Sequence, residues 1–350
     1  MNTRIIKLDP DFPDLSFVKE SADVLRRGGL VVFPTETVYG IGANYLDRVA
    51  IDRLYRVKNR PRTKPFTIHI ADFDALKEQA VELSPRQTRL INKFWPGPLT
   101  VLVFNVKGEK LGFRMPRNKI AIELIRDAKV PVVAPSANLS GDRPARSIGE
   151  LTMQLKGAVD IIIDSGPTEF GIESTVVDTT KEPYEVVREG VISKKEVLAD
   201  YHILFVCTGN SCRSVMAKAM LEKYLKEIGF SDKVWVDSAG TGTYTGIYAA
   251  PNTIEVIKEE GIDVSDHKGK SISPELLRKS DFIYIMEHIH RKMILNMLPE
   301  ADSKIRLLNE EEDIPDPIGK PLVEYRRVKD IIKDKVEDIF LELFEKEKKS

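Results

Sequence analysis

The stretch HILFVCTGNSCRSVMAKAMLEKYLKEIG, residues 202–229, constrains the fold more than any other part of this 350-residue chain. Its apolar run predicts a buried strand, the small polar residues after it predict a tight loop, and the remainder predicts a helix. Further apolar runs, VWVDSAG and FIYIMEH, alternate with the helical stretches TIEVIKEEGI and VKDIIKDKVEDIFLELFEKEKK. This alternation predicts a doubly wound parallel sheet for the second half of the chain.

The first half also mixes strands with helices. LVVFPTETVYGIG, VPVVAPSANLSG and VDIIIDSG each predict a strand closed by small polar residues, and IAIELIRDAK predicts a helix. The charged segment REGVISKKEVLAD then separates this half from the next. Because a chain of this length can build two substantial cores, we predict two α/β domains, residues 1–198 and 199–350.

The composition excludes several classes of protein. Apolar residues make up 42% and charged residues 31%, with a formal net charge of −1, so neither a disordered chain nor a strongly basic nucleic-acid binder is expected. No apolar run reaches the ~18 residues of a membrane span, and the start MNTRIIKLDPDFPD lacks a signal-peptide core. Two cysteines make no disulfide framework, so we expect a cytoplasmic protein with no membrane partner.

Both cysteines, Cys207 and Cys212, lie in the predicted loop, and Arg213 follows directly. They could be a metal pair, a disulfide, or a nucleophile with its helper. The loop alone supplies too few metal ligands, because the histidines lie elsewhere in the chain. A cysteine between a strand and a helix meets backbone N–H groups and a positive helix dipole, which favour the thiolate. An arginine six residues later grips phosphate oxygens, so C-x5-R predicts a phosphate cradle with Cys207 as nucleophile.

Such a site also needs an acid that protonates the leaving group. The segment DIPDPIGK offers Asp313 and Asp316, and the residues themselves separate the two only by the proline that follows Asp316. Cys212 is close enough in sequence to form a reversible disulfide with Cys207, which would protect the nucleophile from further oxidation.

The second half resembles the low-molecular-weight protein tyrosine phosphatases. The resemblance rests on VCTGNSCRS, VDSAGTG, GIDVSDHKGKSIS, DFIYIMEH and DIPDPIG, in that order. It implies that Cys207 forms a phosphocysteine, that Arg213 stabilises the transition state and that Asp316 is the acid and then the base. It implies no metal or other cofactor. The remaining phosphate-loop residues that it implies are Thr208, Gly209, Asn210, Ser211, Cys212 and Ser214, of which Ser214 bonds the thiolate and Asn210 holds the loop's shape.

The resemblance leaves two phosphoprotein substrates open. Eukaryotic members carry a bulky apolar residue where this chain has Ser211, and tandem tyrosines where it has Ile318 and Gly319. The wall that stacks on a phosphotyrosine ring is therefore missing. Family members that act on phosphoarginine look similar, with a small hydroxyl residue in the loop, usually threonine. We expect a protein tyrosine phosphatase, with a protein-arginine phosphatase as the alternative.

A basic run marks the first half. Six Lys and Arg residues and no acid fall between Arg53 and Lys64. Pro61 and Pro65 end a helix there, which leaves the basic side chains on a loop. No Walker A pattern occurs in the chain, so a nucleotide would have to be held without a P-loop.

The first half resembles the YrdC family of threonylcarbamoyl-AMP synthases. The resemblance rests on PTETVYGIG, the K-x-R of VKNRPRTKPFTIHI, WPGPLT, FRMPRN, APSANLSG, GIESTVVD and REG. It implies a twisted mixed α/β domain with a basic groove that condenses L-threonine, bicarbonate and ATP to threonylcarbamoyl-AMP and pyrophosphate. Other proteins then transfer the product to tRNA. The ATP-binding residues that it implies, with Mg²⁺ accompanying the nucleotide, are Lys58, Arg60, Arg62, Ser136, Asn138 and Arg188. The threonine-binding residues that it implies are Thr35, His69, Arg114 and Ser174.

A different class of function would use the same groove. The first half could be a double-stranded-RNA or tRNA-binding module without synthase activity, because a basic groove suits a phosphate backbone equally well. The PTET and S-x-N motifs favour the enzyme, since backbone binding needs no threonine pocket. We therefore expect a bifunctional enzyme.

Overall fold

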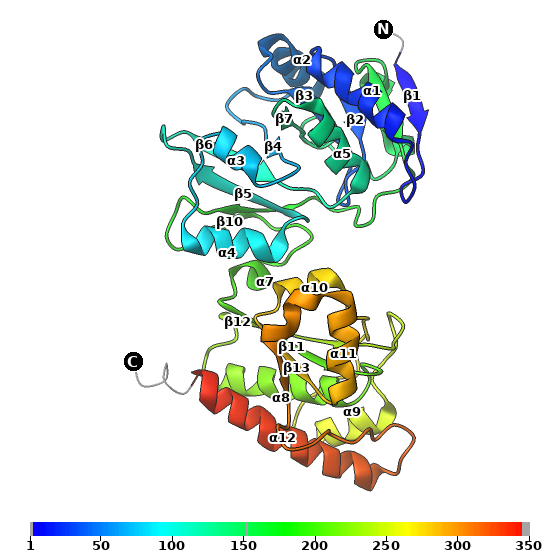
Figure 1. Ribbon diagram of the computed structural model, residues 1–350, viewed down its shortest axis with the longest axis vertical. Coiled ribbons are helices and arrows are strands. Elements are labelled where there is room, and N and C mark those ends of the chain that lie inside the picture. The colour runs from blue at the N-terminus through cyan, green and yellow to red at the C-terminus, as the bar shows by residue number, and fades with distance from the viewer. Residues whose placement is uncertain (1–2, 152, 345–350) are drawn as a thin grey trace. The chain divides into compact units, whose positions relative to one another are not determined.

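A computed structural model describes residues 3–151 and 153–344 of the chain (Figure 1). The chain forms two compact units, Met1–Lys194 and Lys195–Ser350. This division, between residues 194 and 195, falls just before the predicted join at 198/199. Helix α7 (Lys194–Leu198) begins at the last residue of the first unit and continues into the second. Each unit has its own sheet and core.

The first unit is built on a mixed sheet of ten strands in the order β1-β8-β2-β3-β7-β4-β6-β5-β9-β10. The sheet combines parallel pairs, such as β5 with β9, and antiparallel pairs, such as β5 with β6, which confirms the predicted mixed α/β architecture. The strands are β1 (Arg4–Lys7), β2 (Val31–Phe33), β3 (Gly40–Asn44), β4 (Ile68–His69), β5 (Leu99–Phe104), β6 (Lys110–Arg114), β7 (Val132–Val133), β8 (Ile161–Asp164), β9 (Thr175–Asp178) and β10 (Glu185–Arg188).

Two long helices cover one end of this sheet. In α1 (Leu15–Arg26), Val18, Ala22 and Leu25 recur at helical spacing and are fully buried against α5 (Lys119–Ala128) and strands β2 and β8. Asp14 caps α1 by accepting from the backbone N–H of Ser16. The other helices of this unit are α2 (Arg48–Lys58), α3 (Asp74–Glu78), α4 (Pro85–Phe94), the 3₁₀ helix η1 (Ile148–Glu150) and α6 (Met153–Lys156).

The second unit has four parallel strands in the order β12-β11-β13-β14, which confirms the predicted parallel sheet. The strands are β11 (Tyr201–Cys207), β12 (Val234–Gly240), β13 (Phe282–Ile285) and β14 (Ile305–Leu307). Successive residues of β11 face opposite sides of the sheet: Phe205 joins one buried cluster, and Leu204 and Val206 join another. The sheet is therefore covered on both faces, as a doubly wound fold requires.

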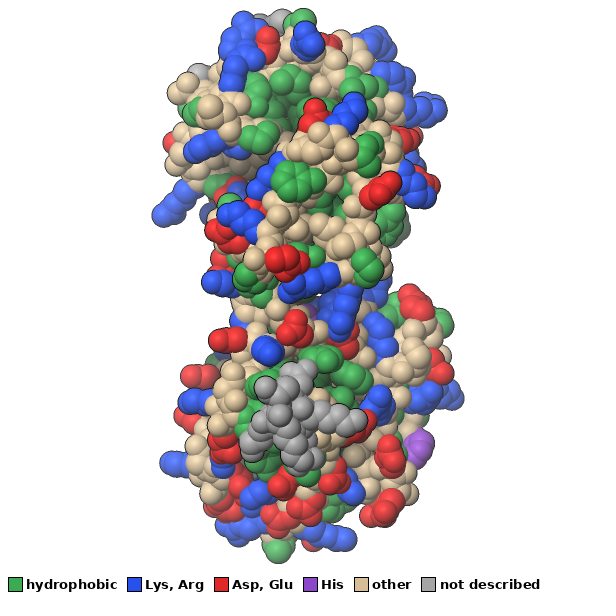
Figure 2. Space-filling model, turned by 90° about the vertical axis from the view of Figure 1, so that its left-hand side faces the viewer, with side chains coloured by type: hydrophobic (Ala, Val, Ile, Leu, Met, Phe, Trp, Pro, Cys, Tyr) green, Lys and Arg blue, Asp and Glu red, His purple; other side chains and the backbone are tan. Residues whose placement is uncertain are grey.

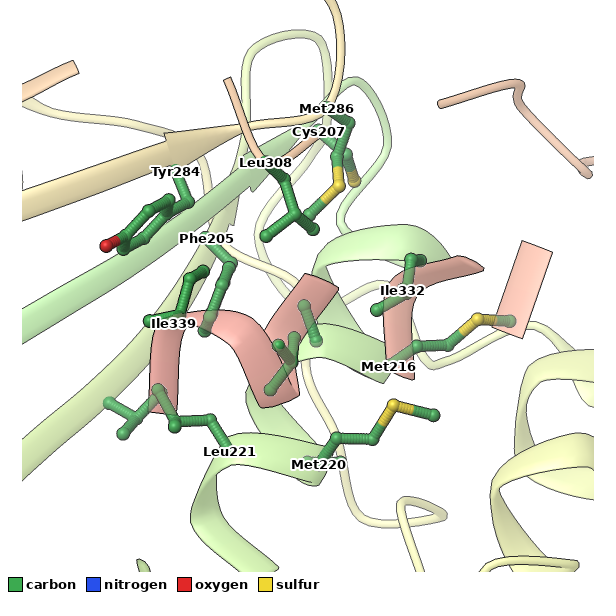
Figure 3. Packing of buried hydrophobic residues seen from close by; sticks show 14 of the residues in the cluster. Phe205, Cys207, Met216, Met220, Leu221, Tyr284, Met286, Leu308, Ile332 and Ile339 are labelled. Atoms are coloured by element: carbon green, nitrogen blue, oxygen red, sulfur yellow. The ribbon is translucent and has the colours of Figure 1, made fainter. Parts of the chain in front are cut away.

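The helices of this unit divide between the two faces (Figure 1). On one face, Met216, Met220 and Leu221 of α8 pack with Ile332 and Ile339 of α12 (Figure 3). The opposite cluster takes apolar residues from α10 and α11. The helices are α8 (Arg213–Glu227), α9 (Pro251–Lys258), α10 (Pro274–Lys279), α11 (His288–Met297), the 3₁₀ helix η2 (Pro299–Lys304) and α12 (Leu322–Phe344).

Charged side chains of both signs are interspersed over the face of each unit that Figure 2 shows. This distribution agrees with the near-zero net charge of the chain. Among the described residues, no helix combines the length and the apolar character that crossing a membrane requires.

Candidate active sites

The first site is the loop between β11 and α8, at the carboxyl end of the parallel sheet. Strand β11 ends at Cys207 and α8 begins at Arg213, so the predicted phosphate loop connects them. The backbone N–H of Asn210 points at Cys207 Sγ, 3.2 Å away, and Ser214 Oγ lies 3.0 Å from the same sulfur. A backbone N–H and a hydroxyl group thus face the sulfur.

Asn210 holds the loop from inside. Its φ of 48° lies in the left-handed region, which asparagine tolerates better than most residues. Its side chain donates to Ser214 Oγ at 2.9 Å and to Ser238 Oγ at 3.0 Å, and accepts from the backbone N–H of Lys270 at 2.9 Å. Because Asn210 donates to Ser214, the hydroxyl proton of Ser214 is free to point at Cys207.

Gly240 lets the loop pack against the neighbouring strand β12. A Cβ at this position would lie 2.6 Å from the carbonyl oxygen of Thr208, 2.8 Å from Thr243 Cγ2 and 3.1 Å from the backbone nitrogen of Asn210. No side chain other than the hydrogen of glycine fits there. The first glycine of VDSAGTG, Gly240, is therefore required for the phosphate loop to pack against β12.

Arg213 is buried and its guanidinium is fully oriented by the protein. Nη1 donates to Glu287 Oε2 at 2.7 Å and to the carbonyl of Ile314 at 2.8 Å. Nη2 donates to Asp316 Oδ2 at 2.7 Å. Nε is buried and has no hydrogen-bond partner within residues 3–151 and 153–344, so one donor remains for an anion in the loop.

The structure separates the two candidate acids that the sequence left nearly equivalent. Asp316 pairs with Arg213 and is partly exposed. Asp313 instead accepts from the backbone N–H of His288 at 2.8 Å and lies 2.7 Å from its Nδ1. Of the two carboxylates, Asp316 is the one in direct contact with the phosphate-loop arginine.

Cys207 and Cys212 are both buried free thiols. Burial raises the pKa of Cys212, and its sulfur lies 3.8 Å from the hydroxyl of Tyr325. The disulfide between the two cysteines stays a prediction. Ser211 Oγ lies 3.6 Å from Cys212 Sγ, and Ile318 is 56% exposed beside Asp316, so the loop flank is polar and open.

Sequence reasoning did not identify Glu287, His290 or Tyr325 around this loop. Glu287 and His290 follow β13, the strand next to β11, and the carboxyl ends of neighbouring parallel strands meet at the site. Their place after FIYIM was the available signal. Tyr325 comes from the far end of the unit, and no local pattern points to it.

The second site is a cleft in the first unit that brings together residues far apart in the sequence. Of the ten residues that the resemblance implied, seven line this one cleft: Thr35, Arg60, His69, Arg114, Ser136, Ser174 and Arg188. Only Lys58, Arg62 and Asn138 are not part of its wall.

Arg114, in the cleft wall, is paired with the buried Glu36, which sequence reasoning did not identify. Arg114 Nη2 donates to Glu36 Oε1 at 2.6 Å and to Thr37 Oγ1 at 2.8 Å, and Nε is buried without a partner in the part of the chain described. Burial pushes the pKa of Glu36 up, but Arg114 and two backbone N–H groups outweigh it, so the pKa lies below its usual value. The sequence signal that was missed is Glu36 and Thr37, near the centre of PTETVYG.

His69 pairs with Arg114 across strands β4 and β6. Burial, with a further contribution from Arg114, lowers the pKa of His69 to about 3, so the imidazole is neutral at neutral pH. Nδ1 lies 3.3 Å from the carbonyl of Thr67, which can only accept, so Nδ1 carries the proton. Nε2 is then a hydrogen-bond acceptor in a cleft otherwise rich in cations.

Lys58 lies beneath the S-x-N motif. Its ammonium donates to the carbonyl of Ser136 and, at 2.7 and 3.2 Å, to the carbonyl and Oδ1 of Asn138. Burial, with a smaller effect of Arg60, lowers the pKa of Lys58 to about 8. Arg62 points elsewhere and pairs with Asp52 at 2.7 Å. Binding of the triphosphate by Lys58 and Arg62 stays a prediction.

Arg188 reaches the cleft from β10. It donates to the carbonyl of Ser174 at 2.9 Å and pairs with Glu173 at 2.6 Å. Ser174 Oγ in turn lies 2.9 Å from Thr100 Oγ1. Glu173 and Thr100 were not identified from the sequence. Among residues 3–151 and 153–344, no group of three or more His, Cys, Asp or Glu is arranged to hold a metal ion.

Comparison with known proteins places both units. Residues 23–190 match the Sua5, YciO and YrdC family model, described as telomere recombination. A threonylcarbamoyl-AMP synthase from Pyrococcus abyssi is 39% identical over 189 residues, which is 51% of this chain and 56% of that protein. A putative threonylcarbamoyl-AMP synthase from Mycobacterium tuberculosis is 32% identical over 51% of this chain and 87% of that protein. The chain belongs, through its first unit, to the threonylcarbamoyl-AMP synthase family.

The chain spans only about half the length of the first synthases that it matches, 56% in Pyrococcus abyssi and Bacillus subtilis. A solved structure of a Sua5 mutant from P. abyssi superposes with a TM-score of 0.53 and 27% identity, over 68% of this chain and 91% of that one. E. coli YciO superposes with a TM-score of 0.50 and 26% identity, over 56% of this chain and 99% of that one. Both agree with a synthase-family fold for the first unit.

The second unit matches the family model for low molecular weight phosphotyrosine protein phosphatase over residues 202–350. A solved arginine phosphatase, YwlE from Geobacillus stearothermophilus, is 34% identical over 42% of this chain and 94% of that one, with a TM-score of 0.39. The chain therefore joins a synthase-family unit to a second unit whose residues 202–350 match the low-molecular-weight phosphatase model.

Proposed function

We propose that the protein is a bifunctional enzyme with one activity in each unit. The first unit condenses L-threonine, bicarbonate and ATP to threonylcarbamoyl-AMP and pyrophosphate, as a nucleotidyltransferase that supplies tRNA modification. The second removes phosphate from proteins. Two free thiols in the chain support a reducing compartment, the cytoplasm, for both reactions.

The observation that carries the synthase proposal is the convergence of seven implied residues in one cleft. Bicarbonate takes up a proton and loses water to give carbon dioxide, which adds to the amine of threonine; the amine loses a proton and a carbamate forms. A carbamate oxygen then attacks the α-phosphorus of ATP, and the bond to pyrophosphate breaks. Both steps bring anions together, so cations fixed in a partly dry cleft supply most of the catalysis. Arg60 and Arg188, which line the cleft, would bind phosphate oxygens, and Ser136 would orient phosphate or bicarbonate, with Asn138 accepting from its Oγ at 2.6 Å.

Threonine fits the inner end of the cleft. The buried Nε of Arg114 has no partner in the described chain, so it is available to the carboxylate of threonine. The neutral His69 offers Nε2 as an acceptor to the amine or hydroxyl of threonine. Mg²⁺, which neutralises phosphate charge when bound, would be held mainly by ATP oxygens, since among the described residues Glu173 is the one carboxylate that lines the cleft, and it pairs with Arg188.

Pyrophosphate release tests the synthase. It should require threonine and bicarbonate together, and Arg114→Lys should raise the KM for threonine more than the KM for ATP. An RNA-binding module predicts a different result: affinity for unmodified tRNA that falls about 10³-fold or more between 50 and 200 mM salt, without threonine-dependent turnover. Threonine-independent pyrophosphate release, or none, would contradict the proposal.

The phosphatase proposal rests on Cys207 facing two hydrogen-bond donors at the base of a loop that Arg213 closes. Cys207 Sγ attacks phosphorus, the bond from phosphorus to the leaving group breaks, and Asp316 protonates the leaving atom. Asp316 then takes a proton from the water that hydrolyses the phosphocysteine. Arg213 and the loop amides stabilise the equatorial oxygens in both steps.

The substrate that we propose is phosphotyrosine, with phosphoarginine as a second candidate. The second candidate is favoured by the polar Ser211 and the open flank at Ile318, which supply no wall for an aromatic ring. The test is kcat/KM for matched phosphotyrosine and phosphoarginine peptides, with Cys207→Ser as the blank. A preference for either peptide assigns the substrate, and turnover of neither above the blank would contradict the phosphatase proposal.

A further inference from the structure

A closed ring of hydrogen bonds runs behind the phosphate loop, through a histidine that the reaction proposed above does not use. His290 is fully buried on α11, and its Nε2 lies 3.0 Å from Thr208 Oγ1. Its Nδ1 accepts from the backbone N–H of Glu287 at 3.2 Å. Glu287 in turn binds Arg213 at 2.7 Å, and Arg213 Nη2 lies 3.5 Å from Thr208 Oγ1.

The position of each proton in this ring follows from its neighbours. The Glu287 N–H can only donate, so Nδ1 of His290 must be the acceptor and Nε2 must carry the proton. Nε2 then donates to Thr208 Oγ1, and the nearby Arg213 Nη2–H can only donate as well. With donors on both of these sides, the hydroxyl of Thr208 keeps its own proton for a third partner. Thr208 is exposed at the mouth of the loop, where a substrate enters.

We propose that His290 is a positioning residue that holds Thr208 as a hydrogen-bond donor to the substrate and holds Glu287 against Arg213. This inference rests on the proposed phosphatase function. Thr208 is then a contact that affects substrate choice, since its hydroxyl can donate to the bridging oxygen or a phosphate oxygen of the substrate. His290 acts only through Thr208 and Glu287.

Protonation of His290 would break the ring. An Nδ1–H would oppose the Glu287 N–H, and the cationic ring would attract Glu287 Oε2, which lies 3.5 Å from Nε2, away from Arg213. Four charged groups face the imidazole: Glu287 on its own segment, Arg213 from α8, and Asp313 and Asp316 from the loop before α12. Burial lowers the pKa of His290 and outweighs the three carboxylates, so the imidazole stays neutral at neutral pH.

A double-mutant cycle on the full-length protein tests the coupling, with 4-nitrophenyl phosphate as the probe. We expect His290→Leu and Thr208→Val each to lower kcat/KM about tenfold. The loss in the double variant should be about as large as the loss in either single variant. His290→Asn keeps an acceptor at the place of Nδ1 for the Glu287 N–H, although its amide stops short of Thr208 Oγ1, so it should lose less than His290→Leu loses. His288→Asn, at an exposed histidine on the same helix, is the control and should combine additively with Thr208→Val.

The pH profile supplies a readout that a purely structural role would not change. On the acidic side of the profile, log kcat/KM plotted against pH should be steeper by about one unit for wild type than for His290→Asn. The reason is that asparagine cannot take up a proton. Parallel acid limbs, an additive cycle, or equal losses in His290→Asn and His290→Leu would overturn the inference. Wild-type protein without Cys207-dependent turnover would remove the proposed function and the inference with it, whereas an active enzyme with an additive cycle removes only the inference.

Discussion

Asp316 Oδ2 and Arg213 Nη2 lie 2.7 Å apart, so the proposed acid and the phosphate-binding cation form an ion pair across the mouth of the loop. The Asp316 carboxylate also accepts from the backbone N–H of Ile318 at 3.1 Å, which fixes its orientation. The ion pair keeps the carboxylate of Asp316 beside the guanidinium of Arg213. In the proposed reaction Asp316 must take up a proton before it can act as the acid.

Replacing this acid should affect the chemical step most. We expect Asp316→Asn to lower kcat for a phosphotyrosine peptide about 10²- to 10³-fold, because a poor leaving group must be protonated as it departs. With 4-nitrophenyl phosphate, whose leaving group needs little protonation, the loss should be several-fold smaller. Asp313→Asn, three residues earlier in the chain and paired with His288, is the control and should stay near wild type. Equal losses with both substrates would contradict a general-acid role.

Gly240 offers a test of the packing that shapes the loop. Gly240→Ala would force a Cβ to 2.6 Å from the Thr208 carbonyl, so the loop must shift, and we expect phosphatase kcat/KM to fall at least about tenfold. Gly242→Ala places its Cβ no closer than 3.6 Å to any atom beyond its two chain neighbours and should stay within about twofold. Pyrophosphate release by the first unit serves as the internal reference in both variants. Similar activities in the two variants would show that the loop tolerates the shift.

The phosphatase loop could be predicted because its determinants are local. A strand, a loop and a helix follow one another in residues 202–229, and C-x5-R places nucleophile and cation on the same loop. The choice between Asp313 and Asp316 needed tertiary structure, because the two differ in which distant partner they meet. Glu287 and His290 could not be assigned roles, since their contacts with Arg213 and Thr208 join segments more than seventy residues apart.

In the first unit, the resemblance identified residues of the cleft, but it did not show which of them are buried or paired with other charges. The resemblance implied Lys58, Arg60 and Arg62 for the triphosphate; in the structure Lys58 donates to the S-x-N motif and Arg62 pairs with Asp52, and their binding of ATP stays a prediction. Periodicity cannot show which way a lysine near a helix end points. The pairing of Arg114 with Glu36 depends on a long-range contact for the same reason.

Glu36 should determine threonine affinity through Arg114. In Glu36→Gln one amide edge must face a donor, either Arg114 Nη2 or the backbone N–H of Arg117, so the buried arrangement cannot be kept. We expect the KM for threonine to rise about tenfold with a smaller change in kcat. Glu169→Gln, which removes an exposed partner of Arg117, is the matched control and should leave the KM unchanged. An unchanged KM in Glu36→Gln would mean that Arg114 does not bind the substrate carboxylate.

The buried His69 should make the stability of the first unit depend on pH. Its pKa is about 3 when folded, against 6.5 as the ordinary value. Between these values the unfolded chain binds the extra proton, so the free energy of unfolding falls as the pH falls below 6.5. The change from pH 7 to pH 5 should be about 2 kcal/mol for this one group, and His69→Gln should lack it.

Urea unfolding at several pH values would measure this difference. The chain has two tryptophans, and the buried Trp95 reports on the first unit once Trp235→Phe has removed the other signal. The free energy of unfolding of His69 protein relative to His69→Gln protein, both in the Trp235→Phe background, should drop steadily from pH 7 to pH 5. A difference that stays constant over this range would show that His69 is not held neutral by burial, and the hydrogen-bond acceptor assigned to the threonine site would be lost with it.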